Sequence, residues 1–420
     1  MLQQIQIAVV GVGNRARKYL ACLPAGVKVK YLVEPDLVRL GLGSKRYGVP
    51  AENCYASADA FFAAPVELDA VIIAAPDKLH VSLAIKAVQR GWHVLVEKPV
   101  AASEEEYMRL LSAAEASGVQ VGVCLEMRFY PFFKRIKEIC RYGMLGQIRE
   151  IEHTEHIGPD RMAHTFVRGL WSKKEETGHI FLSKCCHDAD FILWLTGAEV
   201  LDVRSSGSLS KFTHDPSAPF YCIDCKKRTC PYSAVKIYRD RREWISGFDV
   251  PAGLTLGDVI DAELHGGRYG RCVYHCDNDV YDVQDVEATL SGGIRLRMHL
   301  EGVSDLEGRS VVIRGTEAVL EADRTHIKVV ATGSGADGAK KVPGAEGAKM
   351  VPGADGAAEP VPAGTVLLEE DYSSIVALPL HAGADKALVE DFFDAVANNR
   401  TPAASLASAL PAHKLCWLAG

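Results

Sequence analysis

One short stretch near the start of this chain constrains its fold more than any other. The apolar run IQIAVV, at residues 5–10, leads directly into the sequence GVGNRA, which begins at Gly11 and opens a stretch with helical spacing. In such a strand-turn-helix unit, the first glycine allows a tight turn, Gly13 lets the backbone approach a pyrophosphate, and Ala16 permits close packing. The helix N-terminus would face the phosphates. Alone, the motif also fits a glycine-rich turn that binds nothing, but a P-loop is excluded because no Gly-Lys-Ser/Thr ending follows.

The residues that follow the next strands strengthen the interpretation as a dinucleotide site. The run VKVKYLV, at residues 27–33, ends at Glu34, where an acidic side chain can bond a ribose 2′-hydroxyl. Because a carboxylate there repels a 2′-phosphate, NAD is favoured over NADP. Two further strands end at Ala75-Pro76 and at Glu97-Lys98-Pro99, and ligands of a doubly wound sheet lie outside such carboxyl ends.

Lys98 is the candidate catalytic residue at this edge. A lysine beside the nicotinamide can polarise or hydrogen-bond a substrate hydroxyl, and the cationic ring would make its charged form less favourable. The alternative is that Lys98 is an ordinary surface lysine at a strand end, without a catalytic role. Pro99 argues against it, because a proline stiffens the turn and aims the preceding side chain.

The pattern of apolar runs predicts two domains of different class. Over residues 1–125, short β-branched runs alternate with amphipathic stretches, which indicates an α/β domain with a doubly wound parallel sheet, the Rossmann arrangement. From residue 126 to 420, longer alternating runs, such as DVEATLSGGIRLRMHLEG at 285–302, suit an α+β domain with a large, open, mostly antiparallel sheet. DKALVEDFFDAVANN, which begins at Asp385, predicts a closing helix.

Residues 335–362 interrupt the second domain with a nine-residue repeat rich in Gly, Ala and Pro. The segment has no aromatic residue and nothing to bury, so we expect a mobile low-complexity insertion between two strands. A calcium-binding β-roll is the sharper alternative, but its repeat needs paired glycines and an aspartate in each turn, an order that these copies lack.

The stretch SKCCHDADF predicts a helix that Ser183 caps and that ends at Gly197. On this helix Lys184, His187 and Asp188 share a face. A histidine suits the removal of a hydroxyl proton, with a neighbouring carboxylate to orient its ring; a structural histidine is the alternative. Adjacent cysteines cannot readily chelate one ion on a helix, so we interpret the following pair as packing residues: Cys185 and Cys186.

Taken together, the motifs resemble those of the glucose-fructose oxidoreductase, inositol dehydrogenase and MocA family of nicotinamide-dependent sugar oxidoreductases. The resemblance spans the chain except the repeats, and it rests on GVGNRA, AAP with His80, EKP, RFYP, GMLGQI, Trp171, and His187 followed by Asp190. It implies a Rossmann domain and an α+β domain whose open sheet forms oligomer contacts. The chain departs from many members in having Ser183, followed by Lys184, where they carry an aspartate.

The resemblance also implies roles for individual residues. Lys98 and His187 would carry out the chemistry on a sugar hydroxyl. Lys184 is our own further candidate, because its cluster with His187 and Asp188 could supply the additional base that a redox-neutral glycoside cleavage needs. The residues expected at the cofactor are Gly11, Gly13, Asn14, Arg15, Glu34, Ala75, Pro76, His80, Glu97, Lys98 and Trp171. Those expected at the substrate are Arg128, Tyr130 and Asp188, together with four from two polar segments that could equally be turns: Arg168, Tyr274, Asp277 and Asn278.

A second cysteine group has the spacing of a metal site. CIDCKKRTC supplies Cys222, Cys225 and Cys230, and Cys272 is a candidate fourth ligand, although His275 and Cys276 also lie within reach in sequence. A structural zinc and free thiols are both compatible with this spacing. A zinc ion there would hold a long loop beside the active site and would do no redox work.

The composition of the chain limits the kinds of binding partner and the cellular compartment that we expect. The net charge is −7 and the basic residues are scattered, which excludes nucleic acid and an anionic membrane as expected partners. No apolar run is long enough for a membrane span, and the N-terminus lacks the features of a signal peptide, so we expect a cytoplasmic protein with reduced thiols. The resemblance adds a homo-oligomer, a dimer or tetramer formed through the second sheet.

The sequence therefore predicts an NAD-dependent oxidoreductase that takes hydride from a secondary hydroxyl, at C3 in our expectation, of a sugar or glycoside. One alternative is a redox-neutral glycosidase, which oxidises, eliminates the aglycone, adds water and reduces again while recycling NAD. A third hypothesis is a regulator that senses NAD and sugar, and it would predict loss of Lys98 or His187, both of which are present.

Overall fold

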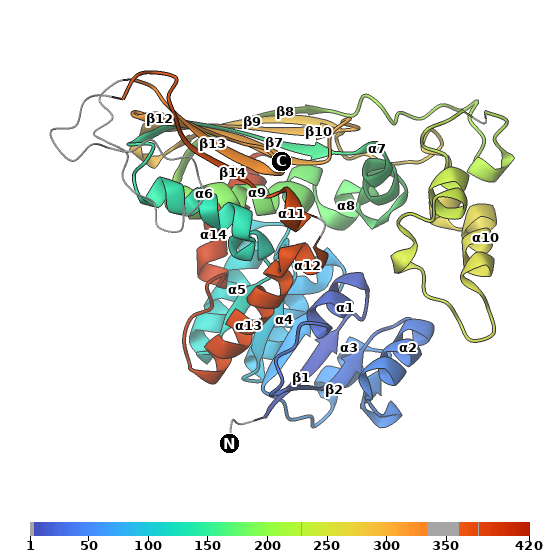
Figure 1. Cartoon of the computed structure of the whole chain (residues 1–420). Coiled ribbons are helices and arrows are strands. Elements are labelled where there is room, and N and C mark those ends of the chain that lie inside the picture. The colour runs from blue at the N-terminus through green and yellow to red at the C-terminus, as the bar shows by residue number, and fades with distance from the viewer. Residues whose placement is uncertain (1–3, 228, 334–360, 377) are drawn as a thin grey trace.

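The computed structural model describes residues 4–227, 229–333, 361–376 and 378–420. Two sheets dominate these residues, each with helices packed against it (Figure 1). The predicted repeat insertion at 335–362 lies outside the described residues except for its last two positions. Among the described helices, none combines the length and apolar composition that a membrane span requires.

The first sheet has the predicted doubly wound parallel architecture. Its strand order is β3-β2-β1-β4-β5-β6, so the direction of winding reverses between β1 and β4, where the crevice for a ligand opens. The strands are β1 Ile5–Val10, β2 Val27–Val33, β3 Cys54–Tyr55, β4 Ala70–Ile73, β5 His93–Val96 and β6 Val121–Val123. The helices are α1 Asn14–Leu20, α2 Leu37–Tyr47, α3 Ala58–Ala63, α4 His80–Gln89 and α5 Glu104–Ser117.

The second sheet is large and mostly antiparallel, which confirms the predicted fold class. Its order is β14-β13-β12-β11-β7-β10-β9-β8, and only β7 and β10 run parallel to each other. The strands are β7 Ile148–Ile157, β8 Val200–Ser208, β9 Val283–Leu290, β10 Ile294–Gly302, β11 Gly308–Gly315, β12 Ala318–Ala322, β13 His326–Ala331 and β14 Val366–Asp371. Residues alternate between buried and exposed along β9, so one face packs on a core and the other faces solvent.

Helices α6, Pro131–Arg141, and α9, Ile180–Thr196, cover the inner face of this sheet (Figure 1). The predicted start of α9 is wrong by one turn. His179 caps the helix by accepting a hydrogen bond from the backbone N–H of Leu182, and Ser183 lies inside it, while the predicted end at Gly197 is confirmed by its left-handed φ of 65°. Cys185 and Cys186 are buried packing residues.

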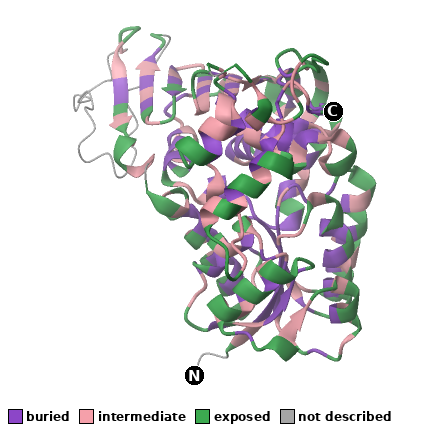
Figure 2. Cartoon of the chain, turned by 90° about the vertical axis from the view of Figure 1, so that its right-hand side faces the viewer, coloured by how far each residue is buried: buried purple, intermediate pink, exposed green. Residues whose placement is uncertain are grey.

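The C-terminal helices return to the first domain. These are α13, Ala384–Ala397, and α14, Leu406–Leu418. Phe392 packs into the core on one side of the first sheet, and Ser405 forms a β-bridge with Gly122 at its edge. Figure 2 shows the resulting buried residues along the first sheet and between the second sheet and its helices. The division at residue 125 therefore stays a prediction for the start of the second domain, but residues 384–420 pack on both sheets.

An insertion between β8 and β9 forms a small subdomain, which we call the 209–282 insertion. It contains helix α10, Leu256–Gly266, and its own apolar cluster around Tyr238 and Leu264. Figure 1 shows it beside the two sheets, with a loop that extends toward the first domain. The remaining short helices are α7 Pro159–Arg161, α8 Lys174–Thr177, α11 Ser373–Val376 and α12 Pro379–Ala382.

Candidate active site

The glycine turn after β1 has the shape that a dinucleotide requires. Gly11 has φ +85°, and a Cβ atom there would lie 2.5 Å from the carbonyl oxygen of Ala74, so only glycine fits. At Gly13 an added Cβ would meet nothing within 4 Å, which leaves open space beside the N-terminus of α1. The residues present therefore fit a pyrophosphate at this turn.

Glu34 lies beside the same turn, as the motif requires. Its Oε2 accepts a hydrogen bond of 2.9 Å from the backbone N–H of Val12, and its Oε1 accepts one of 3.1 Å from the backbone N–H of Asp36. Arg39, on α2, approaches Oε1 at 3.4 Å. An acidic group is thus held where the ribose hydroxyls of a dinucleotide would lie.

The strand ends after β4 and β5 are tied together. His80 contacts the carbonyl oxygen of Pro99 through Nδ1, at 2.8 Å, and that of Ala75 through Nε2, at 2.9 Å. His80 therefore positions the two loops, and its contacts are to backbone. The neighbouring Pro76 and Asp77 form the start of the next turn, and Trp171 donates a 3.0 Å hydrogen bond from Nε1 to Asp77. This bond brings Trp171 from the second domain to the cofactor edge.

Arg15 and Glu97 face each other at the mouth of this crevice. The guanidinium of Arg15 lies 2.8 Å from Glu97, 3.2 Å from Asp385 and 3.7 Å from Glu126. Tyr19 also donates to Glu97. Burial would raise the pKa of Glu97, but the charge of Arg15 outweighs it and holds that pKa below its usual range.

Lys98 and His187 meet at one turn of α9. Nζ of Lys98 donates a 2.8 Å hydrogen bond to the backbone carbonyl of Ser183, one helical turn before His187. On the other side of Lys98, the backbone N–H of Val100 donates to Nε2 of His413 on α14, at 3.0 Å. The catalytic candidates therefore come from the end of β5 and from α9. Helix α14 supports the loop that follows β5 and carries Lys98.

The two candidates have opposite pKa shifts. Burial, followed by the charges of Lys98 and Arg309, holds the pKa of His187 well below its usual value. Burial would also lower the pKa of Lys98, but the neighbouring Cys186 and the carboxylates of Glu97 and Glu126 raise it above the ordinary lysine value. Near neutral pH, His187 is therefore a neutral imidazole and Lys98 a cation. Pairs of groups with pKa values pushed apart are typical of acid-base sites.

Glu126 is a site residue that the sequence reasoning missed. It follows β6, and its Oε1 lies 3.5 Å from Nε2 of His187. Burial would raise its pKa, but Arg15, His381 and Lys98 hold that pKa below the usual range, so Glu126 is charged. The rule that ligands lie at strand ends, applied to the third of these neighbouring strands, would have pointed to it.

Lys184 and Asp188 belong to a buried ion-pair network on the other side of α9. Lys184 pairs with Glu155 of β7, and Glu155 also lies 3.0 Å from Arg309 of β11. Asp188 is fully buried, 2.5 Å from Arg309 and 2.8 Å from His153. Its oxygens are engaged by these partners, so the structure gives Asp188 a packing role and not the expected substrate contact. The ammonium of Lys184 is likewise held by Glu155.

The RFYP segment is also structural in its contacts. Arg128 is buried and binds Asp190 through two hydrogen bonds of 2.8 and 2.5 Å, and it also bonds Ser408 of α14. Tyr130 caps α6 and packs against Phe133. The guanidinium of Arg128 is occupied in joining α9 to α14. The expectation that they contact substrate is not retained.

Four more expected substrate residues lie in or against the 209–282 insertion. Arg168 is 1% exposed and donates to the backbone carbonyls of Arg271 and Tyr232. Tyr274 packs against aromatic rings, Asp277 pairs with Lys173 and Arg271, and Asn278 donates to the carbonyl of Phe212. These contacts hold the insertion together, so none of the four is retained at the substrate.

The proposed zinc ligands are not gathered into one site. Among the described residues, no three cysteine sulfur atoms lie within 4.8 Å of one another. Cys222 and Cys272 are nevertheless neighbours that share a hydrogen bond, and this bond and Arg168 lower the pKa of Cys222 to about 5. Cys222 and Cys272 are therefore neighbours, and among the described residues Cys225 and Cys230 do not join them as a tetrahedral set.

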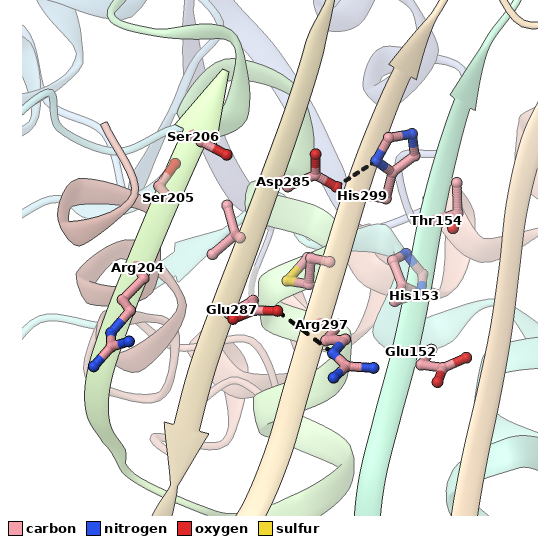
Figure 3. Close-up of a pocket in the computed structure, with 12 residues that line it drawn as sticks. Glu152, His153, Thr154, Arg204, Ser205, Ser206, Asp285, Glu287, Arg297 and His299 are labelled. Atoms are coloured by element: carbon pink, nitrogen blue, oxygen red, sulfur yellow. Dashed lines mark hydrogen bonds and ion pairs between the residues drawn. The ribbon is translucent and has the colours of Figure 1, made fainter.

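A further pocket lies on the second sheet. Figure 3 shows charged side chains across neighbouring strands, with Asp285 bonded to His299 at 2.7 Å and Glu287 paired with Arg297 at 3.5 Å. Glu152, Thr154 and Arg204 complete the polar surface. Since the covering helices lie on the opposite face, this pocket is on the solvent-facing side of the sheet.

Comparisons with known proteins agree with this arrangement. Residues 5–125 match the family described as "Oxidoreductase family, NAD-binding Rossmann fold". The protein YteT of Bacillus subtilis is 25% identical over 306 residues, which are 70% of this chain and 70% of YteT. Inositol 2-dehydrogenase 1 of Saccharopolyspora erythraea is 29% identical over 226 residues, which are 50% of this chain and 62% of that protein.

Among solved structures, an oxidoreductase from Agrobacterium radiobacter in complex with NAD+, L-tartaric acid and magnesium has the same fold. Its TM-score is 0.66 at 15% identity, with 99% of this chain and 94% of that chain covered. At this identity the likeness concerns the fold. It extends over both domains, whereas the family match is confined to the first.

Proposed function

Because this chain belongs to the glucose-fructose oxidoreductase, inositol dehydrogenase and MocA family, we propose that it takes hydride from a secondary hydroxyl of a sugar or glycoside and transfers it to NAD. The observation that carries the proposal is the meeting of a cationic Lys98 and a neutral His187 at the carboxyl edge of the first sheet. C3 is the position that we expect to react.

The two side chains have complementary tasks. Nε2 of His187 faces Glu126, and Nδ1 hydrogen-bonds no described residue, so we assign Nδ1 as the nitrogen that accepts the hydroxyl proton. The positive charge that forms on the ring is then stabilised by the Glu126 carboxylate. Lys98 donates a hydrogen bond to the substrate oxygen and stabilises the negative charge that develops there. NAD, when bound, supplies the hydride acceptor.

The cofactor would be held by the groups described above. The turn from Gly11 to Arg15 would hold the pyrophosphate, with Asn14 at the start of α1, and Glu34 would bond the adenosine ribose. Trp171 and Asp77 lie at the nicotinamide end, near Lys98. Burial raises the pKa of Asp77 above its usual range in spite of the nearby cations.

The decisive experiment incubates the pure protein with NAD and a panel of inositols, free sugars and aryl glycosides, and follows NADH and released aglycone separately. NADH that accumulates while the glycoside stays intact supports the proposal. Aglycone release without net NADH would replace it by the redox-neutral glycosidase. Sugar and NAD binding without turnover would replace it by the sensing regulator.

We further propose that the protein acts in the cytoplasm as a homo-oligomer, a dimer or tetramer, through the solvent-facing side of the second sheet (Figure 3). The support is the pattern of complementary charges there, such as Arg297 beside Glu287. Light scattering at several salt concentrations tests it, and a monomer at every concentration would refute it.

A further inference from the structure

The 209–282 insertion reaches the proposed cofactor site through a short segment, residues 244–249. With its amide oriented to satisfy both groups, the Asn14 side chain donates to the carbonyl of Ser246 at 3.0 Å and accepts from the N–H of Gly247 at 3.3 Å. Asn14 is the first residue of α1, directly after the glycine turn. The segment therefore touches the first domain at the place where a pyrophosphate would bind.

Asp249, at the end of this segment, binds two arginines of the first domain. Nη2 of Arg17, on α1, contacts its Oδ1, and Nε of Arg39, on α2, lies 2.8 Å from its Oδ2. The Asp249 side chain is 10% exposed. Burial would raise its pKa, but the hydrogen bonds and charges of Arg17 and Arg39 lower it, so Asp249 is ionised. The carboxylate of Asp249 thus binds the guanidinium groups of both Arg17 and Arg39.

Arg39 connects this contact to the ribose position. Its Nη1 lies 3.4 Å from Oε1 of Glu34, the residue proposed to bond the adenosine ribose. Guanidinium groups are strong partners for a phosphate, because they donate two parallel hydrogen bonds. Without Asp249, Arg17 and Arg39 would offer two such groups beside the ribose. With Asp249 present, their charge and donors are already engaged.

We propose that Asp249 is a cofactor-selectivity residue, which withholds Arg17 and Arg39 from a ribose 2′-phosphate and so makes the site accept NAD and reject NADP. Glu34 repels the 2′-phosphate directly, and Asp249 removes the positive groups that would compensate for that repulsion. The inference rests on the dinucleotide binding proposed above and on no assumption about the sugar. It assigns a part of cofactor recognition to the second domain, outside the glycine motif.

The test measures binding of NADH and NADPH to the full-length protein by fluorescence titration, so no turnover is needed. Asp249→Asn keeps the size of the side chain but removes its charge, and we expect it to improve the affinity for NADPH relative to NADH by about tenfold. Asp261→Asn is the matched control, because Asp261 lies on α10 of the same insertion and pairs with the exposed Arg239 at 2.6 Å. It should leave the ratio unchanged.

A second variant separates selectivity from simple disruption. Adding Arg39→Ala to Asp249→Asn should cancel the gain for NADPH, because the released guanidinium is then absent. An unchanged ratio in Asp249→Asn, with NADH still bound by the wild type, would overturn the selectivity role alone. A wild type that binds neither dinucleotide would overturn the proposed function together with this inference. If Asp249→Asn fails to fold, Asp249→Glu is measured instead, because it keeps the negative charge. An affinity for NADPH relative to NADH equal to that of the wild type supports the role, and an increased relative affinity for NADPH contradicts it.

Discussion

Nε2 of His187 lies 3.5 Å from Oε1 of Glu126, so the proposed base has a carboxylate partner that comes from the end of β6 and not from its own helix. The acids on α9 itself are engaged elsewhere, because Asp188 binds Arg309 and Asp190 binds Arg128. Ser183 contributes its backbone carbonyl to Lys98. A carboxylate from another element thus stands opposite the imidazole.

Replacing Glu126 by Gln is expected to lower kcat by about tenfold or more, since the imidazolium that forms on His187 loses its negative partner. NAD affinity should change little, and the acid limb of the kcat profile should move to lower pH. A merely structural role would not move that limb. Glu138→Gln, on the exposed side of α6, is the control and should retain wild-type kcat.

Replacing Lys98 by Met should abolish turnover while NAD binding stays largely intact. The pKa of His187 is held down by burial and then by the charge of Lys98, so removing that charge should raise this pKa toward about 6.5. Histidine-selective NMR titration of both proteins measures the shift. Full activity in Lys98→Met would contradict the catalytic assignment, and an unchanged His187 titration would contradict the electrostatic coupling.

The two glycines of the turn should respond differently to alanine. Gly11→Ala places a Cβ 2.5 Å from a backbone oxygen at a φ of +85°, and we expect it to cost more than about 2 kcal/mol of unfolding free energy. Gly13 has φ −76° and open space around its Cβ position, so Gly13→Ala should change stability by less than about 0.5 kcal/mol but weaken NAD binding. Chemical denaturation and NAD titration of both variants check this.

Acid should destabilise the fold through buried neutral histidines. Burial lowers the pKa of His413 to about 4, below its unfolded value of about 6.5. As pH falls through this window the unfolded state binds the proton first, so stability is complete above about pH 6.5 and is lost toward pH 4, by up to about 3 kcal/mol for this residue. Denaturation of the wild type and of His413→Gln measures the contribution, because the variant should show a weaker dependence on pH.

The sequence predicted the elements whose chemistry is local. The strand-turn-helix at Gly11, the acid at Glu34 and the strand end at Lys98 follow from rules that hold over about 20 residues. It also predicted helix α13 and the alternation of the second sheet, but not α14, which follows α13 and is the last helix of the described residues. The start of α9 was missed because His179 is a rarer cap than serine, and the hydrogen bond that identifies it is visible only in three dimensions.

The expected substrate residues were less predictable for the same reason. A charged residue in a promising segment can contact a ligand or form a buried ion pair, and only the tertiary structure distinguishes the two. Arg128 and Asp190 are 62 residues apart and bind each other, and Asp249 meets Arg17 across 232 residues. No local pattern specifies such partners, since each pair forms only after the sheets and the insertion have packed.

The return of α14 to the first domain has a consequence for synthesis. Val100 and His413 are 313 residues apart, yet their hydrogen bond supports the loop that carries Lys98. During translation, the first sheet is synthesised well before α13 and α14, the helices that complete its core. Its edge therefore stays exposed until α14 has been synthesised. Contacts of such long sequence separation slow folding, and they prolong the time during which apolar surface of the first domain is exposed.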